Sequence, residues 1–422
     1  MRDLALERSS APVALAGGAA LLAALLGVLI ARMPILAGVV LVALGLGISV
    51  MRFGAVGAVV PAFAALPWLV ILEGHIPHAV GTATAAVAVG ALLFYLAPLS
   101  YRSPLVPAAA TAFLAVVLLH AVYVTDGEQA IQAAKYTVFA AIVLAVCSER
   151  ARELLPPLKT PVLASCLLAM VFHLGVVAAG AGASSTYYEV GEKLGFAADG
   201  PHALALMSMI VAAAGLTVER TWKQLSFFAL GAVPVALTGV RSALFGLAVV
   251  LVIYVVQSPN RRRALFVLGS LVAIALAAGG LDVLSARFSA HPGEFSSVAT
   301  AGSGRGEIWR VAFDAWGAAG PGAWLVGTGL RSILEFELAA LGTELVGHSD
   351  IVEVLVQLGV VGFAAWVALW LGLLRARLRA VVLLPIFAFA MVNGSLEYVA
   401  PLTAGIFLAA VCVEPRRDPA PT

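Results

Sequence analysis

The stretch QLSFFALGAVPVALTGVRSALFGLAVVLVIYVVQ, residues 224–257, decides how this chain is arranged. As one helix it would extend about 50 Å, well beyond the roughly 30 Å of hydrocarbon in a bilayer. Pro234, Gly239 and Arg241 interrupt the middle of the stretch. We therefore predict a hairpin of two short helices that meet at Arg241, each about 24 Å long.

The composition of the whole chain is that of an integral membrane protein. Hydrophobic residues make up 62% of the 422 residues and charged residues only 11%, far less charge than a soluble domain carries. Together with the hairpin, the other long apolar runs predict an all-α, polytopic membrane protein of about 12–14 transmembrane helices. These runs lie at 12–31, 34–51, 54–72, 79–98, 104–124, 129–147, 161–182, 202–218, 264–281, 351–374, 380–394 and 399–413.

The distribution of basic residues supports the hairpin. With fourteen spans and a cytoplasmic N-terminus, 17 of the 25 Lys and Arg residues fall on the inner side, as the positive-inside rule requires. One long helix would instead place the basic segments 219–223 and 260–263 on opposite faces of the membrane. We therefore predict that both termini are cytoplasmic.

One polar segment dominates the predicted outer face. It divides the chain into a transmembrane bundle (1–281), a large loop (282–349), and C-terminal transmembrane helices with a short cytoplasmic tail (350–422). Within the loop, GEIWRVAFDAW places Ile308, Val311, Ala312 and Ala315 on one helical face, and RSILEFELAAL has a similar pattern. Both segments are expected to be amphipathic helices that lie on the membrane or cap a cavity.

Three arginines are candidates for binding an anion. Arg241 at the tip of a short apolar hairpin costs several kcal/mol unless it faces a wet cavity or an anion, and the alternative is that it snorkels to lipid phosphates. Arg305 and Arg310 flank Trp309 in the first loop helix. Being five residues apart they point in different directions, so only one is expected to face a site, and each could instead be a solvated loop arginine.

His348 opens an apolar span directly after the arginine-containing loop. Histidine is the natural general base near neutral pH. The alternative is a residue at the start of a helix whose N-cap is Ser349 or Asp350. No second histidine or carboxylate shares its turn in a metal-ligand pattern, so we predict no metal.

Two further residues could line the same site. Lys135 lies about two turns into its span, near the outer end, and either snorkels outward or points into the cavity that Arg241 faces. Glu397, on an outer connection, could orient a base or bind sugar hydroxyls, or could be part of a short polar turn. Several guanidiniums suit a phosphate or diphosphate. Because the chain has no ATP motif, we expect an activated substrate and no cofactor.

Three stretches of the chain resemble the O-antigen ligase and O-antigen polymerase superfamily of bacterial envelope glycosyltransferases. They are LTGVRSALFGLAVVLVIY (237–254), GSGRGEIWRVAFDAW with LVGTGL (302–330), and VGHSDIVEVLVQLGVVGFAAW (346–366). The chain departs from the family pattern at Val240, where serine is usual, at Ser349, which replaces asparagine, and at Gln357, near the usual glutamate. These departures leave the subfamily and the acceptor open.

The resemblance implies a metal-independent, GT-C-like glycosyltransferase of the bacterial inner membrane with its active site on the periplasmic side. Its donor would be a glycan on undecaprenyl diphosphate, and its acceptor a sugar hydroxyl of a glycolipid or glycan, such as the lipid A core. Arg241 and Arg305 would bind the diphosphate, with Arg310 in reserve, and His348 would activate the acceptor with inversion at the anomeric carbon. The lipid bilayer is the other expected partner, and no nucleic acid is expected.

Two alternatives to an O-antigen ligase stay open. A polymerase of the same superfamily would move the glycan onto another repeat unit. A transporter or flippase of lipid-linked glycan would also need arginines for a diphosphate. A transporter is expected to have internal repeats and mid-membrane polar residues in both halves, whereas we find no convincing repeat, and the polar residues gather at the outer face.

Overall fold

The structure is a computed structural model that describes residues 54–72, 78–178, 184–186, 192–194, 201–258, 260–277, 305–341, 349–376 and 378–413. The spans expected at 12–31 and 34–51 lie outside these ranges, as does His348. The chain divides into two compact units, Met1–Pro61 and Ala62–Thr422. All of the candidate site residues with described positions belong to the second unit.

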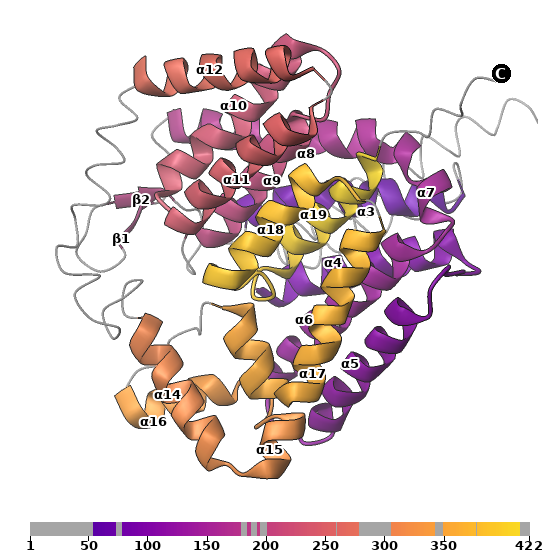
Figure 1. The fold of residues 1–422 in the computed structure, drawn as a ribbon, viewed down its shortest axis with the longest axis vertical. Coiled ribbons are helices and arrows are strands. Elements are labelled where there is room, and N and C mark those ends of the chain that lie inside the picture. Colours follow the sequence, from indigo (N-terminus) through magenta and orange to yellow (C-terminus); the bar gives the residue numbers. More distant parts are fainter. Residues whose placement is uncertain are drawn as a thin grey trace, which may run out of the picture. The chain divides into compact units, whose positions relative to one another are not determined.

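Helices dominate the described residues (Figure 1). Between α8 and α9, β1 (Ser184–Thr186) and β2 (Glu192–Leu194) pair as a short antiparallel ladder. The predicted all-helical class is confirmed, with this one small addition in the described part of the chain. In order, the helices are α3 (Val56–Leu72), α4 (His78–Leu96), α5 (Leu105–Ala121), α6 (Gly127–Cys147), α7 (Ala151–Leu154), the 3-10 turn η2 (Pro156–Leu158), α8 (Lys159–Ala178), α9 (His202–Gly215), α10 (Thr221–Thr238), α11 (Arg241–Gln257), α12 (Arg261–Ala277), α14 (Arg305–Ala318), α15 (Pro321–Val326), α16 (Ser332–Leu341), α17 (Asp350–Arg375), α18 (Ala380–Asn393) and α19 (Val399–Val411).

The predicted spans within the described ranges coincide with helices whose ends agree to within a few residues. By length and composition, four segments of the described chain are long and apolar enough to cross a membrane: Ala79–Leu96, Gly127–Cys147, Ala151–Val176 and Asp350–Arg375. Other apolar helices are shorter, at 10–17 residues. The chain is thus a polytopic membrane protein, while the total of fourteen spans stays a prediction.

The hairpin predicted for residues 224–257 is confirmed. Helix α10 ends at Thr238, and Gly239 follows with φ 63°, in the left-handed region that glycine adopts without a steric penalty. The backbone N–H of Gly239 donates to the carbonyl of Ala236 and closes the helix. Helix α11 then begins at Arg241, so the arginine lies at the turn of the hairpin.

Helix α10 packs closely against α9, and contacts at two glycines show that the helices run antiparallel. A Cβ at Gly231 would collide with the backbone of Ser208, and a Cβ at Gly215 would lie 2.7 Å from the Cβ of Phe227. Small residues allow such close approach of two helices in a membrane. This register, continued toward the end of α10, places the Gly239 turn level with the first turn of α9.

Two short helices form the interior of the second unit. Every residue of α19 is buried, and in α9 every residue after His202 is buried. A helix that is apolar all round is surrounded by other helices, here by α10, α18 and α6 among others. Within this interior the rings of Phe63 and Phe407 stack at 3.8 Å between centroids. Both short helices therefore lie inside the protein, with other helices around them.

The helices of the predicted outer loop pack on the first half of α17 (Figure 1). Of the apolar face expected on α14, Ile308, Val311 and Ala312 are buried and Ala315 is partly buried. Helices α14, α16 and α17 share a small apolar core, to which their aromatic side chains add. The core consists of Ala312, Ile333, Val352 and Val356, with Trp309, Trp316 and Phe336 packed against it.

Helix α17 is interrupted at Gly359, which has φ 67° and ψ −173°. The interruption leaves carbonyls without their helical partners, and the segment after α15 supplies donors for them. The N–H of Thr328 donates to Val356 at 3.0 Å, and the N–H of Gly329 donates to Gln357 at 3.2 Å. Backbone polar groups at membrane depth must be satisfied within the protein, so α15 and the break in α17 depend on one another.

Candidate functional site

The connection between α18 and α19, residues 394–398, receives polar side chains from three other elements. Arg305 of α14 binds the end of α18 directly before it, Asp350 of α17 binds its middle, and Lys135 of α6 binds Glu397. Gly394 begins the connection with φ 68°. The connection therefore gathers residues that are more than 250 positions apart in the sequence.

Arg305 is the first residue of α14, and its guanidinium lies against the last turn of α18. Its Nη1 donates to the carbonyl of Val392 at 2.5 Å, and its Nη2 donates to Oδ1 of Asn393 at 2.8 Å. The side chain is partly buried. Two donors of a planar guanidinium fix its orientation as well as its position.

Arg241 lies at the same end of the helix bundle as Arg305. The α9–α10 register sets the Gly239 turn level with the start of α9, and Gly246 of α11 meets Met209 about two turns further along α9. The first residue of α9, His202, contacts Asn393 at 3.0 Å. Because Asn393 also holds Arg305, the packing brings the two predicted arginines to one end of the second unit.

Arg310 faces a different environment from Arg305. Its guanidinium pairs with Glu307 and, at 3.1 Å, with Asp314, and its side chain is 60% exposed. The hydrogen bond that Arg310 donates to Glu307 lowers the pKa of this carboxyl below its ordinary value. The expectation that the two arginines point in different directions is met, and the structure places Arg305 toward the bundle.

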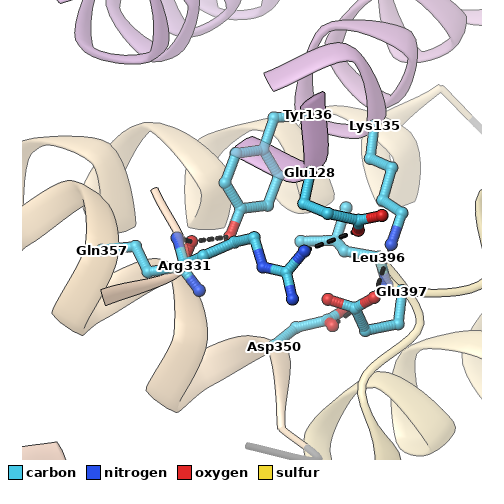
Figure 2. Close-up of polar contacts among 8 residues, drawn as sticks. All are labelled: Glu128, Lys135, Tyr136, Arg331, Asp350, Gln357, Leu396 and Glu397. Carbon is cyan, nitrogen blue, oxygen red and sulfur yellow. Dashed lines mark hydrogen bonds and ion pairs between the residues drawn. The ribbon is translucent and has the colours of Figure 1, made fainter. Parts of the chain in front are cut away.

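Lys135 and Glu397 form an ion pair that is mostly shielded from solvent. The Nζ of Lys135 lies 2.5 Å from Oε2 of Glu397, with side-chain exposures of 13% and 23%. Figure 2 shows the two side chains pointing toward one another, with Asp350 beside them. The structure therefore turns Lys135 toward the α18–α19 connection, and Glu397 lies in the short polar turn expected of it.

A second ion pair joins α6 to the segment between α15 and α16 (Figure 2). Nη1 of Arg331 lies 2.5 Å from Oε2 of Glu128, in the first turn of α6. The N–H of Arg331 donates to Oε1 of Gln357 at 3.0 Å, and the hydroxyl of Tyr136 donates to the same oxygen at 3.2 Å. These bonds tie α6 and α17 to the segment that precedes α16.

Two carboxylates at the start of α17 have different surroundings. Asp350 accepts from the hydroxyl of Ser395 at 2.6 Å and from the N–H of Leu396 at 3.1 Å. Glu353, one turn later, is 2% exposed, and neither of its oxygens has a hydrogen-bond partner in the described part of the chain. Its charged neighbours are Asp350, Glu397, Lys135 and Glu337.

His348 lies outside the described residues, so its role stays a prediction. The next residue, Ser349, is described. Ser349 occupies the N-cap position of α17, as one reading of the sequence expected, but its side chain makes no capping hydrogen bond. Its hydroxyl instead donates to the carbonyl of Met391 at 2.9 Å. The α18 carbonyls that anchor Ser349 and Arg305 are therefore on adjacent residues, Met391 and Val392.

Two residues at this end of the bundle, His202 and Asn393, were not predicted from the sequence. His202 directly follows Pro201, and Asn393 directly precedes Gly394. Proline and glycine at these places indicate that a helix begins or ends, but they do not indicate that two helix ends are in contact. Among the described residues, no three His, Cys, Asp or Glu side chains are arranged to hold a metal ion.

Fold and site together define a polytopic helical membrane protein with two arginines at one end of its bundle. Residues 225–367 match the family model described as O-antigen ligase. The resemblance found in the sequence is thereby confirmed, and the match supports a glycosyltransferase of the O-antigen ligase or polymerase type. Arg241, Arg305, Arg310 and His348 lie within the matched segment. No curated protein matches the chain.

Proposed function

We propose that this protein is an O-antigen ligase-like glycosyltransferase. In this proposal it transfers a glycan from undecaprenyl diphosphate to a sugar hydroxyl of an acceptor, such as the lipid A core, at the periplasmic face of the inner membrane. The observation that carries the proposal is the coincidence of the family match, residues 225–367, with the two arginines that the packing brings to one end of the bundle.

The leaving group explains the need for two guanidiniums. As the bond from the anomeric carbon to the diphosphate oxygen breaks, its electrons pass to that oxygen, and negative charge grows on the diphosphate. Arg241 and Arg305 offer fixed donors to this charge, and one such donor is worth roughly 100-fold or more in rate. Arg305 is held in place by Val392 and Asn393 before any substrate binds, which is the preorganisation that such stabilisation requires.

The acceptor hydroxyl is activated by His348 in this proposal. The imidazole takes the hydroxyl proton as the oxygen attacks the anomeric carbon on the side opposite the diphosphate. The products are an inverted glycoside, undecaprenyl diphosphate and an imidazolium that later loses its proton to water. A neutral histidine near pH 7 suits this step.

A test of this function uses purified protein in nanodiscs, undecaprenyl-diphosphate glycan and candidate acceptors, and follows the release of free undecaprenyl diphosphate. We expect release that depends on the acceptor and is lost in His348→Ala. Arg241→Ala is expected to slow release on the order of 100-fold. Arg220→Ala is the matched control, because this exposed arginine directly precedes α10, at the end of the helix opposite Gly239, and it is expected to retain activity.

The outcomes separate the alternatives. An acceptor that is itself a lipid-linked repeat unit would identify a polymerase, and a lipid A core acceptor would identify a ligase. Full activity in Arg241→Ala would remove the diphosphate assignment. No release with any pairing, together with movement of the glycolipid across a vesicle membrane, would identify a transporter.

A further inference from the structure

A chain of two hydrogen bonds joins Arg305 to His202 through a buried amide. Nη2 of Arg305 donates to Oδ1 of Asn393 at 2.8 Å, and Nδ2 of Asn393 lies 3.0 Å from Nδ1 of His202. Asn393 is fully buried. The three residues come from α14, α18 and α9, and only Arg305 lies within the segment that matches the O-antigen ligase family.

The chemistry of these groups fixes their proton positions. A guanidinium has donors and no acceptor, so it must face the amide oxygen of Asn393. The amide NH₂ then faces His202, and because an NH₂ group only donates, Nδ1 of the ring must accept. His202 is therefore neutral in this arrangement and carries its hydrogen on Nε2.

Protonation of His202 is incompatible with this arrangement. An imidazolium has two N–H donors and no acceptor, so its Nδ1 would place a hydrogen against the hydrogens of the amide. Turning the amide over would satisfy His202 but would present the NH₂ group to Arg305. Because Asn393 is buried, water cannot supply the missing acceptor, and an unmatched buried donor costs about 1–3 kcal/mol.

We propose that His202 and Asn393 are positioning residues that hold Arg305 for the diphosphate, and that they do so only while His202 is neutral. The proposal rests on the proposed function, and it adds a requirement that lies outside the family-matched segment. Acidification would release Arg305 from Asn393 and weaken binding of the diphosphate. His202 does not itself touch the substrate.

Other titratable groups surround His202 and are part of the expected response. Tyr398 lies with its ring 6.1 Å from that of His202, and Glu397 precedes it in the same connection. Arg241 begins α11 at the same end. On α8, His173 lies one turn beyond Met170, which contacts Ser208 of α9. The charged side chain of α10, Lys223, lies at the opposite end of that helix.

The first test measures the binding of undecaprenyl diphosphate to protein in nanodiscs between pH 5.5 and 7.5. His202→Gln is the informative variant, because its amide oxygen can accept from Asn393 and does not titrate. The ligand and His348 titrate in the same way for both proteins. Their contributions therefore cancel in the ratio of the wild-type to the variant dissociation constant. We expect this ratio to rise as the pH falls from 7.5 to 5.5, because protonation of His202 in the wild type releases Arg305, whereas the glutamine does not titrate. A constant ratio overturns the proposal.

His120→Gln is the matched control. The Nε2 of His120 lies 2.6 Å from the carbonyl oxygen of Val326, so this ring must donate, and protonation leaves that bond intact. We therefore expect its binding ratio to wild type to stay constant with pH. A pH-dependent ratio of the same size in this control would assign the effect to histidine loss in general and overturn the proposal.

The second test needs no substrate. In protein labelled with ¹⁵N-histidine, the His202 signals are identified by their loss in His202→Gln. At neutral pH we expect Nδ1 to be unprotonated and Nε2 protonated, with a titration midpoint that rises in Arg305→Ala, where the amide is free to turn, and does not rise in Arg310→Ala. A proton on Nδ1 at neutral pH, or an unchanged midpoint in Arg305→Ala, overturns the proposal.

The two tests also separate this proposal from the proposed function. If the wild type neither binds undecaprenyl diphosphate nor releases it, the proposed function fails, and the ¹⁵N measurement still decides whether Arg305 sets the tautomer of His202. If the wild type transfers glycan but the binding ratio and the tautomer contradict the expectation, only the positioning role of His202 fails.

Discussion

Arg305 and Arg310 belong to one helix, are five residues apart and have unlike surroundings. Five residues turn a helix by about 140° from the starting direction. Arg305 lies on the same helical face as the buried residues Ile308 and Ala312, and it binds the end of α18. Arg310 lies on the far side and pairs with Glu307 and Asp314 in the open. The comparison teaches that helical position decides which of two identical side chains can serve a site.

The largest effect on activity is expected from replacing each of these two arginines in turn. Arg305→Ala should slow acceptor-dependent release of undecaprenyl diphosphate on the order of 100-fold, because one preorganised donor to the leaving group is lost. Arg310→Ala should stay within about 3-fold of the wild type, since exposed ion pairs contribute little. Arg305→Lys is not expected to restore activity, because an ammonium cannot reproduce the two fixed bonds of the guanidinium.

Both variants should be compared at matched amounts of folded protein in nanodiscs, with initial rates at saturating acceptor. Equal losses in Arg305→Ala and Arg310→Ala would contradict the assignment of roles to the two faces of α14. A loss confined to Arg310→Ala would make the reserve arginine the diphosphate ligand.

Two ion pairs that differ in solvent exposure allow a similar comparison of their contributions to stability. Lys135–Glu397 is mostly buried, whereas Arg102–Glu149 has side-chain exposures of 70% and 44%. Lys135→Met should lower stability by about 2 kcal/mol, because the mostly shielded Glu397 loses the ammonium group that it faces. Arg102→Met should change stability by less than about 0.5 kcal/mol.

Thermal unfolding in one detergent, followed by tryptophan fluorescence, measures both variants. The double variant Lys135→Met/Glu397→Met should be more stable than Lys135→Met alone, because both charges of the ion pair are then removed together. A double variant as unstable as the sum of its single variants would show that the two side chains do not act as a pair.

Much of the fold could be predicted from the sequence, because helix length in a membrane is set by bilayer thickness and by helix breakers. The excess length of 224–257 and its Pro234 and Gly239 predicted the α10–α11 hairpin, and the described spans agree to within a few residues. The interruption of α17 was not predicted. Gly359 alone does not distinguish a break from a helical glycine, since the donors that stabilise the break, Thr328 and Gly329, lie thirty residues away.

The candidate site was only partly predictable. Arg305 lies on the same face of α14 as Ile308 and Ala312. The helical period of the sequence therefore already indicated which of the two arginines faces the rest of the protein. The bonds to Val392 and Asn393, and the role of His202, depend on which helix ends meet in space. That meeting is decided by the packing of α9, α10, α11 and α18, which no local pattern records.

The smallest expected effect separates the two carboxylates at the start of α17. Asp350 accepts two hydrogen bonds from the α18–α19 connection, whereas Glu353 is buried without a hydrogen-bond partner in the described chain. Glu353→Met, which keeps the side-chain volume and removes the polar atoms, should raise stability by about 1 kcal/mol. Asp350→Ala should lower stability, since the hydroxyl of Ser395 and the N–H of Leu396 lose their acceptor.

Thermal unfolding measures whether each variant is more or less stable than the wild type. Destabilisation by Glu353→Met would mean that its carboxyl has a partner that stabilises it. If Glu353→Met is more stable yet slower in glycan transfer, the unsatisfied carboxyl is retained for activity, as strained polar groups at functional sites often are.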